Sequence, residues 1–231
     1  ENIAEKYKIS RDEQDLFALN SQEKTQKATN KNRFKDEIIK LKINTNDKNF
    51  IFETDEHPRN NLNLEDLKKL KTVFKENGTV TAGNSSGIND GAAATILMSR
   101  EEAELRGVEP LAKVVSWATC GVEPSLMGLG PIPAVNMALK KANWKVEDID
   151  LFEINEAFAA QSIAVIKDLK IKKEKVNVNG GAIALGHPIG ASGTRILVTL
   201  LHEMIRQNKN KGCATLCIGG GMGIAICVEK D

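Results

Sequence analysis

Residues 149–169 read IDLFEINEAFAAQSIAVIKDL, and the fold can be worked out from this stretch. Its first six residues, four of them apolar, have the composition of a short strand that is mostly buried. From Ala157 to Leu169 the apolar residues recur at helical spacing, which predicts an amphipathic helix. A buried strand that passes directly into such a helix is the repeating unit of a layered α/β domain.

The same alternation extends to both sides of this stretch. In chain order we expect strands over 92–98, 111–117, 149–154, 176–178, 214–218 and 224–228, and helices starting near 99 and over 131–143, 157–169 and 196–205. The last two strands flank the glycines of 219–223, a signal for a hairpin. The pattern predicts an α/β layered domain from about residue 110 onward.

The first 80 residues differ in character, being polar and rich in lysine. Ser10 and Glu13 have the spacing of a capping box, so we expect a helix near 11–29. Short apolar stretches at 38–43 and 50–52 enclose a polar turn. The period of Leu64, Leu67, Leu70 and Phe74 predicts a second amphipathic helix, before the composition shifts at Gly78.

The composition argues against several classes of partner. Of the 231 residues 41% are hydrophobic and 27% charged, and the net charge is +1 with only 4% aromatic residues. This balance favours neither nucleic acid nor a membrane surface as partner. No apolar run approaches the roughly 20 residues that a membrane span needs. The four cysteines lie in apolar, glycine-rich surroundings, which favours a reducing compartment.

His187 lies in the most glycine-dense stretch of the chain, residues 180–193. Glycine lets the backbone approach a ligand closely, and Pro188 restricts the conformation of the histidine before it. The plain alternative is a tight structural loop with an incidental histidine. Because the chain has only three histidines, we interpret His187 as the best catalytic candidate.

Cys217 ends an apolar strand and is followed by three glycines. A thiol there can be exposed at the strand tip, beside N–H groups that are free to bind an oxyanion. The alternative is a buried core cysteine, which is our interpretation of Cys213 and Cys227. A zinc site made of these three cysteines and His202 lacks any familiar spacing, and we expect no metal.

Asn155 follows the strand 149–154 and precedes the expected helix. It can serve simply as the N-cap, or its amide can hold a water molecule or a carbonyl oxygen. Residues 83–87 match the G-x-S-x-G pattern of a nucleophile elbow, but such an elbow needs a helix directly after the serine. Here a strand-like segment follows, so the hydrolase interpretation fails.

Taken together, these motifs resemble the thiolase superfamily. Asn155-Glu156-Ala157-Phe158 is followed 32 residues after Asn155 by Gly186-His187-Pro188, and Cys217-Ile218-Gly219 begins 30 residues after His187. The similarity continues through 86–93 and 127–131 and covers essentially the whole chain. Ketoacyl synthases share the fold but lack the Cys-x-Gly motif.

The resemblance implies a five-layered α/β/α/β/α fold with two similar halves and a loop domain that binds coenzyme A (CoA). Residues 1–88 would then be the later part of the CoA-binding loop domain, and 89–109 the last strand and helix of the amino-terminal half. Residues 110–231 would be the carboxy-terminal domain. The nucleophilic cysteine of the family lies in the amino-terminal half, and none of the four cysteines here matches it.

The implied activity is that of an acetyl-CoA C-acetyltransferase, which condenses two acetyl-CoA molecules reversibly to acetoacetyl-CoA and CoA. Gly220 favours this short-chain type. By the resemblance, His187 takes the proton of the nucleophilic thiol and Cys217 is the base of the condensation. Asn155 fixes a water that holds the enolate oxygen, and the N–H of Gly219 holds the thioester oxyanion.

The resemblance also implies which residues meet the substrate. The positions that match pantetheine or acetyl contacts are Ser86, Ala82, Met127, Ala157 and Phe158, and Arg59 matches the nucleotide end of CoA. No cofactor is implied, because CoA thioesters are substrates. We expect a homo-oligomer, dimer or tetramer, in the cytoplasm, with mitochondria as the alternative compartment. Alternative functions are a longer-chain 3-ketoacyl-CoA thiolase and a non-catalytic CoA-binding fragment.

Overall fold

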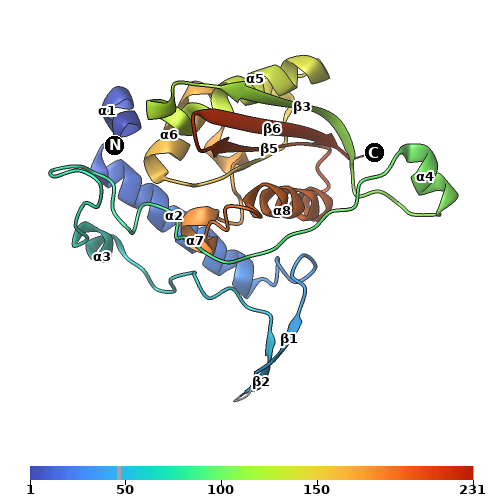
Figure 1. Cartoon of the computed structure of the whole chain (residues 1–231), viewed down its shortest axis with the longest axis horizontal. Coiled ribbons are helices and arrows are strands. Elements are labelled where there is room, and N and C mark those ends of the chain that lie inside the picture. The colour runs from blue at the N-terminus through green and yellow to red at the C-terminus, as the bar shows by residue number, and fades with distance from the viewer. Residues whose placement is uncertain (46–47, 231) are drawn as a thin grey trace.

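A four-stranded mixed sheet forms the centre of the computed structural model, which describes residues 1–45 and 48–230. The strand order is β3–β6–β5–β4 (Figure 1). The bounds are β3 (Lys113–Gly121), β4 (Leu151–Ile154), β5 (Lys211–Ile218) and β6 (Met222–Glu229). Only β4 and β5 pair in parallel, so their carboxyl ends lie at the same edge of the sheet. The predicted strands 149–154, 214–218 and 224–228, with their hairpin, are confirmed.

Helices cover both faces of this sheet (Figure 1). α5 (Pro131–Ala142) and α6 (Ala159–Asp168) pack on one face through an apolar cluster that includes Val135, Phe152 and Val165. α8 (Ser192–Gln207) packs on the other face through Ile196, Leu200 and Met204. The apolar stripes predicted from helical spacing are thus buried, and the layered α/β architecture is confirmed.

The amino-terminal segment packs against helices and loops beside the sheet. α1 (Asn2–Tyr7) precedes α2 (Arg11–Asn30), whose predicted capping box between Ser10 and Glu13 is present. One side of α2 contacts α6, α7 (Ala182–Leu185) and α3 (Leu64–Lys68), with a small apolar cluster between them. The long helix therefore lies directly against the glycine-rich segment (Figure 1).

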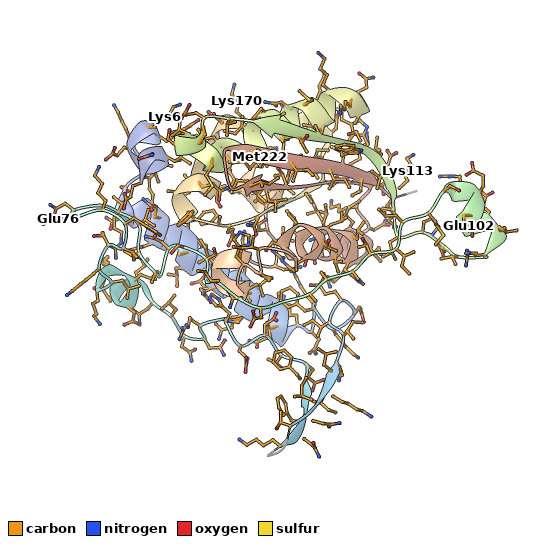
Figure 2. All side chains as sticks on the ribbon, in the orientation of Figure 1. Lys6, Glu76, Glu102, Lys113, Lys170 and Met222 are labelled. Carbon is orange, nitrogen blue, oxygen red and sulfur yellow. The ribbon has the colours of Figure 1, made fainter. Side chains whose placement is uncertain are left out.

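Two elements project from this body. β1 (Leu41–Asn44) and β2 (Asn49–Phe52) pair in antiparallel fashion, and residues 46 and 47, within the polar turn expected between them, lie outside the described residues. α4 (Arg100–Leu105) stands apart on two extended connections, and Figure 2 labels its Glu102. The remaining short elements are the 3₁₀ turns η1 (Pro124–Leu129), η2 (Val146–Asp148) and η3 (Lys173–Lys175).

Three predictions of regular structure are wrong, two because a partner strand is missing and one because another pairing forms. The expected strand 92–98 has no regular structure and leaves Ile96 86% exposed, because none of the described strands lies alongside to complete a hydrogen-bonded ladder. The expected strand 176–178 is reduced to one bridge, between Val176 and Phe152. The helix predicted to reach Phe74 ends at Lys68, since residues 72 and 81 pair instead.

Other boundaries move by a few residues. The strand expected over 111–117 is β3, which begins at Lys113 and continues to Gly121. The helix expected from Ala157 begins at Ala159. In the described part of the chain, no helix is both long and apolar enough to span a bilayer.

Candidate active site

The backbone around His187 is held by the segment 87–89. The His187 N–H donates to the side-chain oxygen of Asn89 and to the carbonyl of Gly87, each at 3.2 Å. Gly186 precedes it at φ 94°, and a Cβ there would lie 2.4 Å from the Asn89 oxygen. Only glycine allows both this left-handed backbone and this close approach. The glycine-dense loop thus fixes where the histidine sits.

The His187 ring is half-buried between two polar side chains. Its Nδ1 lies 2.6 Å from Ser192 Oγ, and its Nε2 lies 3.4 Å from Asn155 Nδ2. Burial, assisted by the positive charge of Arg195, lowers the pKa of His187 below its ordinary value. The ring is therefore neutral at pH 7 and able to accept a proton.

Asn155 is fully buried at the end of β4, and it is not an N-cap. The helix begins later, with Phe158 as N-cap and its N–H bonded to Gln161, so the capping interpretation is wrong. Asn155 Oδ1 has no hydrogen-bond partner in the described part of the chain. A buried amide oxygen without a hydrogen-bond partner lowers the stability of the fold. The position of Asn155 Oδ1 therefore suits a hydrogen bond from a bound water or a ligand group.

Cys217 is 8% exposed, so the expected exposed thiol is instead buried near the end of β5. Burial raises the pKa of Cys217 to about 11, and the thiol is neutral at pH 7. Cys213 and Cys227 are fully buried cross-strand partners on β5 and β6, as their interpretation as core cysteines requires.

The parallel pairing of β4 and β5 relates Cys217 to Asn155. Ile154 is registered against Thr215, and the Asn155 N–H donates to the Thr215 carbonyl at 3.0 Å. Cys217 lies two residues farther along β5, on the same strand face as Thr215. Asn155 and Cys217 therefore lie at one edge of the sheet, with His187 against Asn155.

Residues 219–221 form the turn after Cys217. Gly221 has φ 91°, and a Cβ there would lie 2.5 Å from the carbonyl oxygen of Val122, so the turn packs closely on the segment after β3. Gly219 is exposed, and a Cβ on it would meet no atom within 4 Å. Its surroundings leave room for a ligand beside the backbone.

The structure brings several of the predicted substrate contacts to this edge. The Ser86 N–H donates to the Ala157 carbonyl at 3.0 Å, and residue 85 bridges Phe158. Residue 88 bridges His187, so three loops meet here. Met127 lies in η1, which packs against β5 and β6. Ala82 and Arg59 are exposed on connections farther out, where the Arg59 N–H bonds to Gln22.

A buried carboxylate beneath the loops was missed by sequence reasoning. Glu156 accepts hydrogen bonds from Ser21 Oγ (2.6 Å), Asn177 Nδ2 (2.9 Å) and the Ile183 N–H (3.3 Å). It thereby joins α2 to the loop after β4 and to the glycine-rich segment. The available signal was a carboxylate placed between a buried strand and an apolar helix, where an unpaired charge is unfavourable.

Family comparisons agree with this arrangement along the chain. The model described as "Thiolase, N-terminal domain" matches residues 1–101, and that described as "Thiolase, C-terminal domain" matches residues 108–230. The chain belongs to the thiolase family.

Named relatives of this thiolase chain are acetyl-CoA acetyltransferases. The enzyme of Shinella zoogloeoides is 56% identical over 100% of this chain and 59% of its own length. The cytosolic acetyl-CoA acetyltransferase of Rattus norvegicus is 53% identical over 100% of the chain and 58% of its own length. The chain thus spans about three fifths of the length of these relatives.

Solved structures show that this is the thiolase fold. The acetyl-CoA acetyltransferase of Bacillus anthracis superposes with a TM-score of 0.97 at 49% identity, over 99% of this chain and 58% of that one. Human mitochondrial 3-ketoacyl-CoA thiolase gives a TM-score of 0.93 at 42% identity, over 100% and 58%. Within residues 1–45 and 48–230 of this thiolase chain, no three His, Cys, Asp or Glu side chains gather as metal ligands would.

Proposed function

We propose that the protein is an acetyl-CoA C-acetyltransferase, which converts two acetyl-CoA reversibly to acetoacetyl-CoA and CoA. The observation that carries the proposal is the neutral His187 ring, whose Nε2 faces Asn155. Both residues lie at the sheet edge where Cys217 is located near the end of β5. Relatives at 53–59% identity are named for this activity. The nucleophilic cysteine is proposed to lie in a part of the protein outside these 231 residues.

In the first half-reaction the nucleophilic thiol attacks the acetyl carbonyl of acetyl-CoA. His187 Nε2 takes the thiol proton, which its lowered pKa permits because the ring is neutral beforehand. The N–H of Gly219 is proposed to donate to the thioester oxyanion. CoA leaves as its thiolate and takes a proton from solvent, while the acetyl group stays on the nucleophile and His187 keeps its proton.

In the second half-reaction Cys217 handles the proton of the other acetyl group. In the cleavage direction a neutral thiol is the form needed, since it protonates the carbanion that leaves acetoacetyl-CoA, and the raised pKa of Cys217 supplies that form. In the condensation direction Cys217 first loses its thiol proton to solvent, and the thiolate then removes the methyl proton. The enolate oxygen accepts hydrogen bonds from protonated His187 and from a water held by Asn155.

The proposed substrate contacts come from the resemblance to the thiolase family. Ser86, Ala82, Met127, Ala157 and Phe158 are proposed to meet pantetheine or the acetyl group, and Arg59 the nucleotide end of CoA. The CoA-binding loop domain is proposed for residues 1–88, the end of the amino-terminal half for 89–109, and the carboxy-terminal domain for 110–231. A homo-oligomer, dimer or tetramer, in the cytoplasm completes the proposal, and no cofactor is needed because CoA thioesters are the substrates.

Thiolysis assays test the proposal. The complete protein should cleave acetoacetyl-CoA faster than a long-chain 3-ketoacyl-CoA, and His187→Asn should abolish cleavage, whereas His202→Asn on the outer helix should not. Preference for the long-chain substrate would favour the second candidate, a longer-chain 3-ketoacyl-CoA thiolase. The similarity to human mitochondrial 3-ketoacyl-CoA thiolase supports this candidate. Activity of residues 1–231 alone would contradict the placement of the nucleophile.

A further inference from the structure

Ser192 is a buried hydroxyl in contact with the His187 ring, and the function proposed above assigns it no role. It is the first residue of α8 and is 1% exposed. Its Oγ lies 2.6 Å from His187 Nδ1 and 3.0 Å from the Pro188 carbonyl oxygen. Both distances are those of good hydrogen bonds.

The hydrogen positions on Ser192 and His187 can be assigned by counting hydrogen-bond donors. A hydroxyl has one proton to donate, and a carbonyl oxygen can only accept. Ser192 Oγ donates to Pro188, so it must accept from His187 Nδ1. Nδ1 therefore carries the hydrogen, and the neutral ring has its lone pair on Nε2. The Asn155 amide agrees, since its Nδ2 faces that lone pair as a donor.

The opposite tautomer fits this site less well. If the Ser192 hydroxyl donated to Nδ1, Nε2 would carry the hydrogen and face the N–H of Asn155, so two donors would meet. Turning the Asn155 amide would relieve that clash, but its NH₂ would then be buried in place of a single oxygen acceptor. A buried NH₂ leaves two donors without partners, and this costs more free energy than leaving one acceptor without a partner.

We propose that Ser192 is a positioning residue that holds His187 as the Nδ1–H tautomer and so keeps Nε2 free to accept a proton. This inference rests on the proposed function for its catalytic meaning, although the tautomer itself does not. When Nε2 gains a proton, Nδ1–H still donates to Ser192. The ring can therefore act first as base and then as hydrogen-bond donor without turning.

Nitrogen NMR of the histidine rings tests the assignment directly. The chain has three histidines, and the signals of His187 are identified by their loss in His187→Asn. At pH 8 the unsubstituted protein should show the Nδ1–H pattern at His187. Ser192→Ala should shift it toward Nε2–H, while Ser192→Thr should keep it. Ser162→Ala, at another buried serine within a helix, should leave it unchanged.

An Nε2–H pattern in the unsubstituted protein would overturn the proposal, and so would an unchanged pattern in Ser192→Ala. If Ser192→Ala does not fold, the tautomer of the unsubstituted protein and of Ser192→Thr still decides the matter.

Kinetics supply the second readout. With the complete protein, Ser192→Ala should lower kcat for acetoacetyl-CoA thiolysis by roughly tenfold to a hundredfold with little change in KM, because full loss of an acid–base group costs about 10²–10⁴-fold. Ser192→Thr should restore most of the rate. A normal kcat in Ser192→Ala would contradict the positioning role. If acetoacetyl-CoA is not a substrate at all, the proposed function fails while the NMR result stands by itself.

Discussion

Glu153 in β4 is a buried carboxyl on which two opposing effects act, and its substitution by glutamine separates them. The residue is 2% exposed, and its Oε2 lies 3.8 Å from the Arg195 guanidinium without a hydrogen bond in the described part of the chain. Burial raises the pKa of Glu153 to about 8, although the charge of Arg195 acts in the opposite direction. The effect of burial on the pKa is the larger of the two, so the carboxyl is neutral at pH 7.

The sign of the effect on stability follows from the proton count. Between the ordinary pKa of 4.5 and the folded value of about 8, the folded state holds a proton that the unfolded state has lost. The stability that this proton contributes is fully present below pH 4.5 and is lost as pH rises through about 8. Each unit of pKa corresponds to about 1.4 kcal/mol, so the roughly 3.5 units set a ceiling of about 5 kcal/mol.

Glu153→Gln replaces the neutral carboxyl by an amide of the same shape that cannot ionise. We expect its free energy of unfolding to equal that of the unsubstituted protein near pH 4.5, and to exceed it by a margin that grows to a few kcal/mol at pH 9. Urea unfolding at pH 4.5, 7 and 9 measures this margin. Glu174→Gln, on the exposed turn η3, serves as the control and should show no comparable trend.

The opposite pH dependence would refute the reasoning. An ionised Glu153 paired with Arg195 would make Glu153→Gln destabilising, most of all at high pH, because the substitution would leave a partly buried guanidinium without its partner. A loss of stability of the same size at all three pH values would equally contradict a neutral carboxyl.

Three further predictions concern the site and the glycine turn. Cys217→Ser in the complete protein should slow condensation far more than it slows acetyl transfer to the nucleophile. Retained acetyl transfer would be measured as a burst of CoA release. Equal loss of both steps would contradict the role of Cys217 as base. Because the pKa of His187 is lowered, acetyl transfer should persist as pH falls to 6.5 and fail only below it, and Arg195→Gln should move that limb of the pH–rate profile upward. Gly223→Ala should destabilise the protein by about 1–3 kcal/mol in urea unfolding, since the new Cβ would lie 2.1 Å from backbone atoms of the neighbouring segment, whereas Gly219→Ala should be nearly neutral in stability.

Local patterns predicted those elements whose signal lies within their own stretch of sequence, such as a turn, a cap or a change of period. The β5–β6 hairpin follows from two apolar runs around glycines, and the strand β4 and helix α6 from a change of period at Ile154. The strand expected over 92–98 has the right residues but lacks a neighbouring strand, and β-structure depends on that neighbour more than on propensity. A helix start such as Ser99 is read correctly because its cap is local.

The residues of the candidate site likewise fall into those that local sequence signals reveal and those that only tertiary contacts reveal. His187 and Asn155 could be singled out because glycine density and the end of a strand are visible in the sequence. The burial of Cys217 could not, since it depends on how the turn 219–221 packs on the segment after β3. Glu156 and Ser21 were missed for a similar reason, because their contact joins residues 135 positions apart.

The hydrogen bonds below the site imply that its loops are positioned by α2 as well as by the sheet. Asp15 on α2 accepts from the Asn84 side chain, and the Asn84 carbonyl accepts the N–H of Ala159 at the start of α6. Ser21, six residues farther along α2, donates to Glu156 and accepts from the N–H of Gly181. These contacts are buried, so losing one leaves an unsatisfied polar group rather than an exposed one. The loops that carry Ser86, Asn155 and His187 are therefore coupled through one helix, and a change on its inner face would reach all three together.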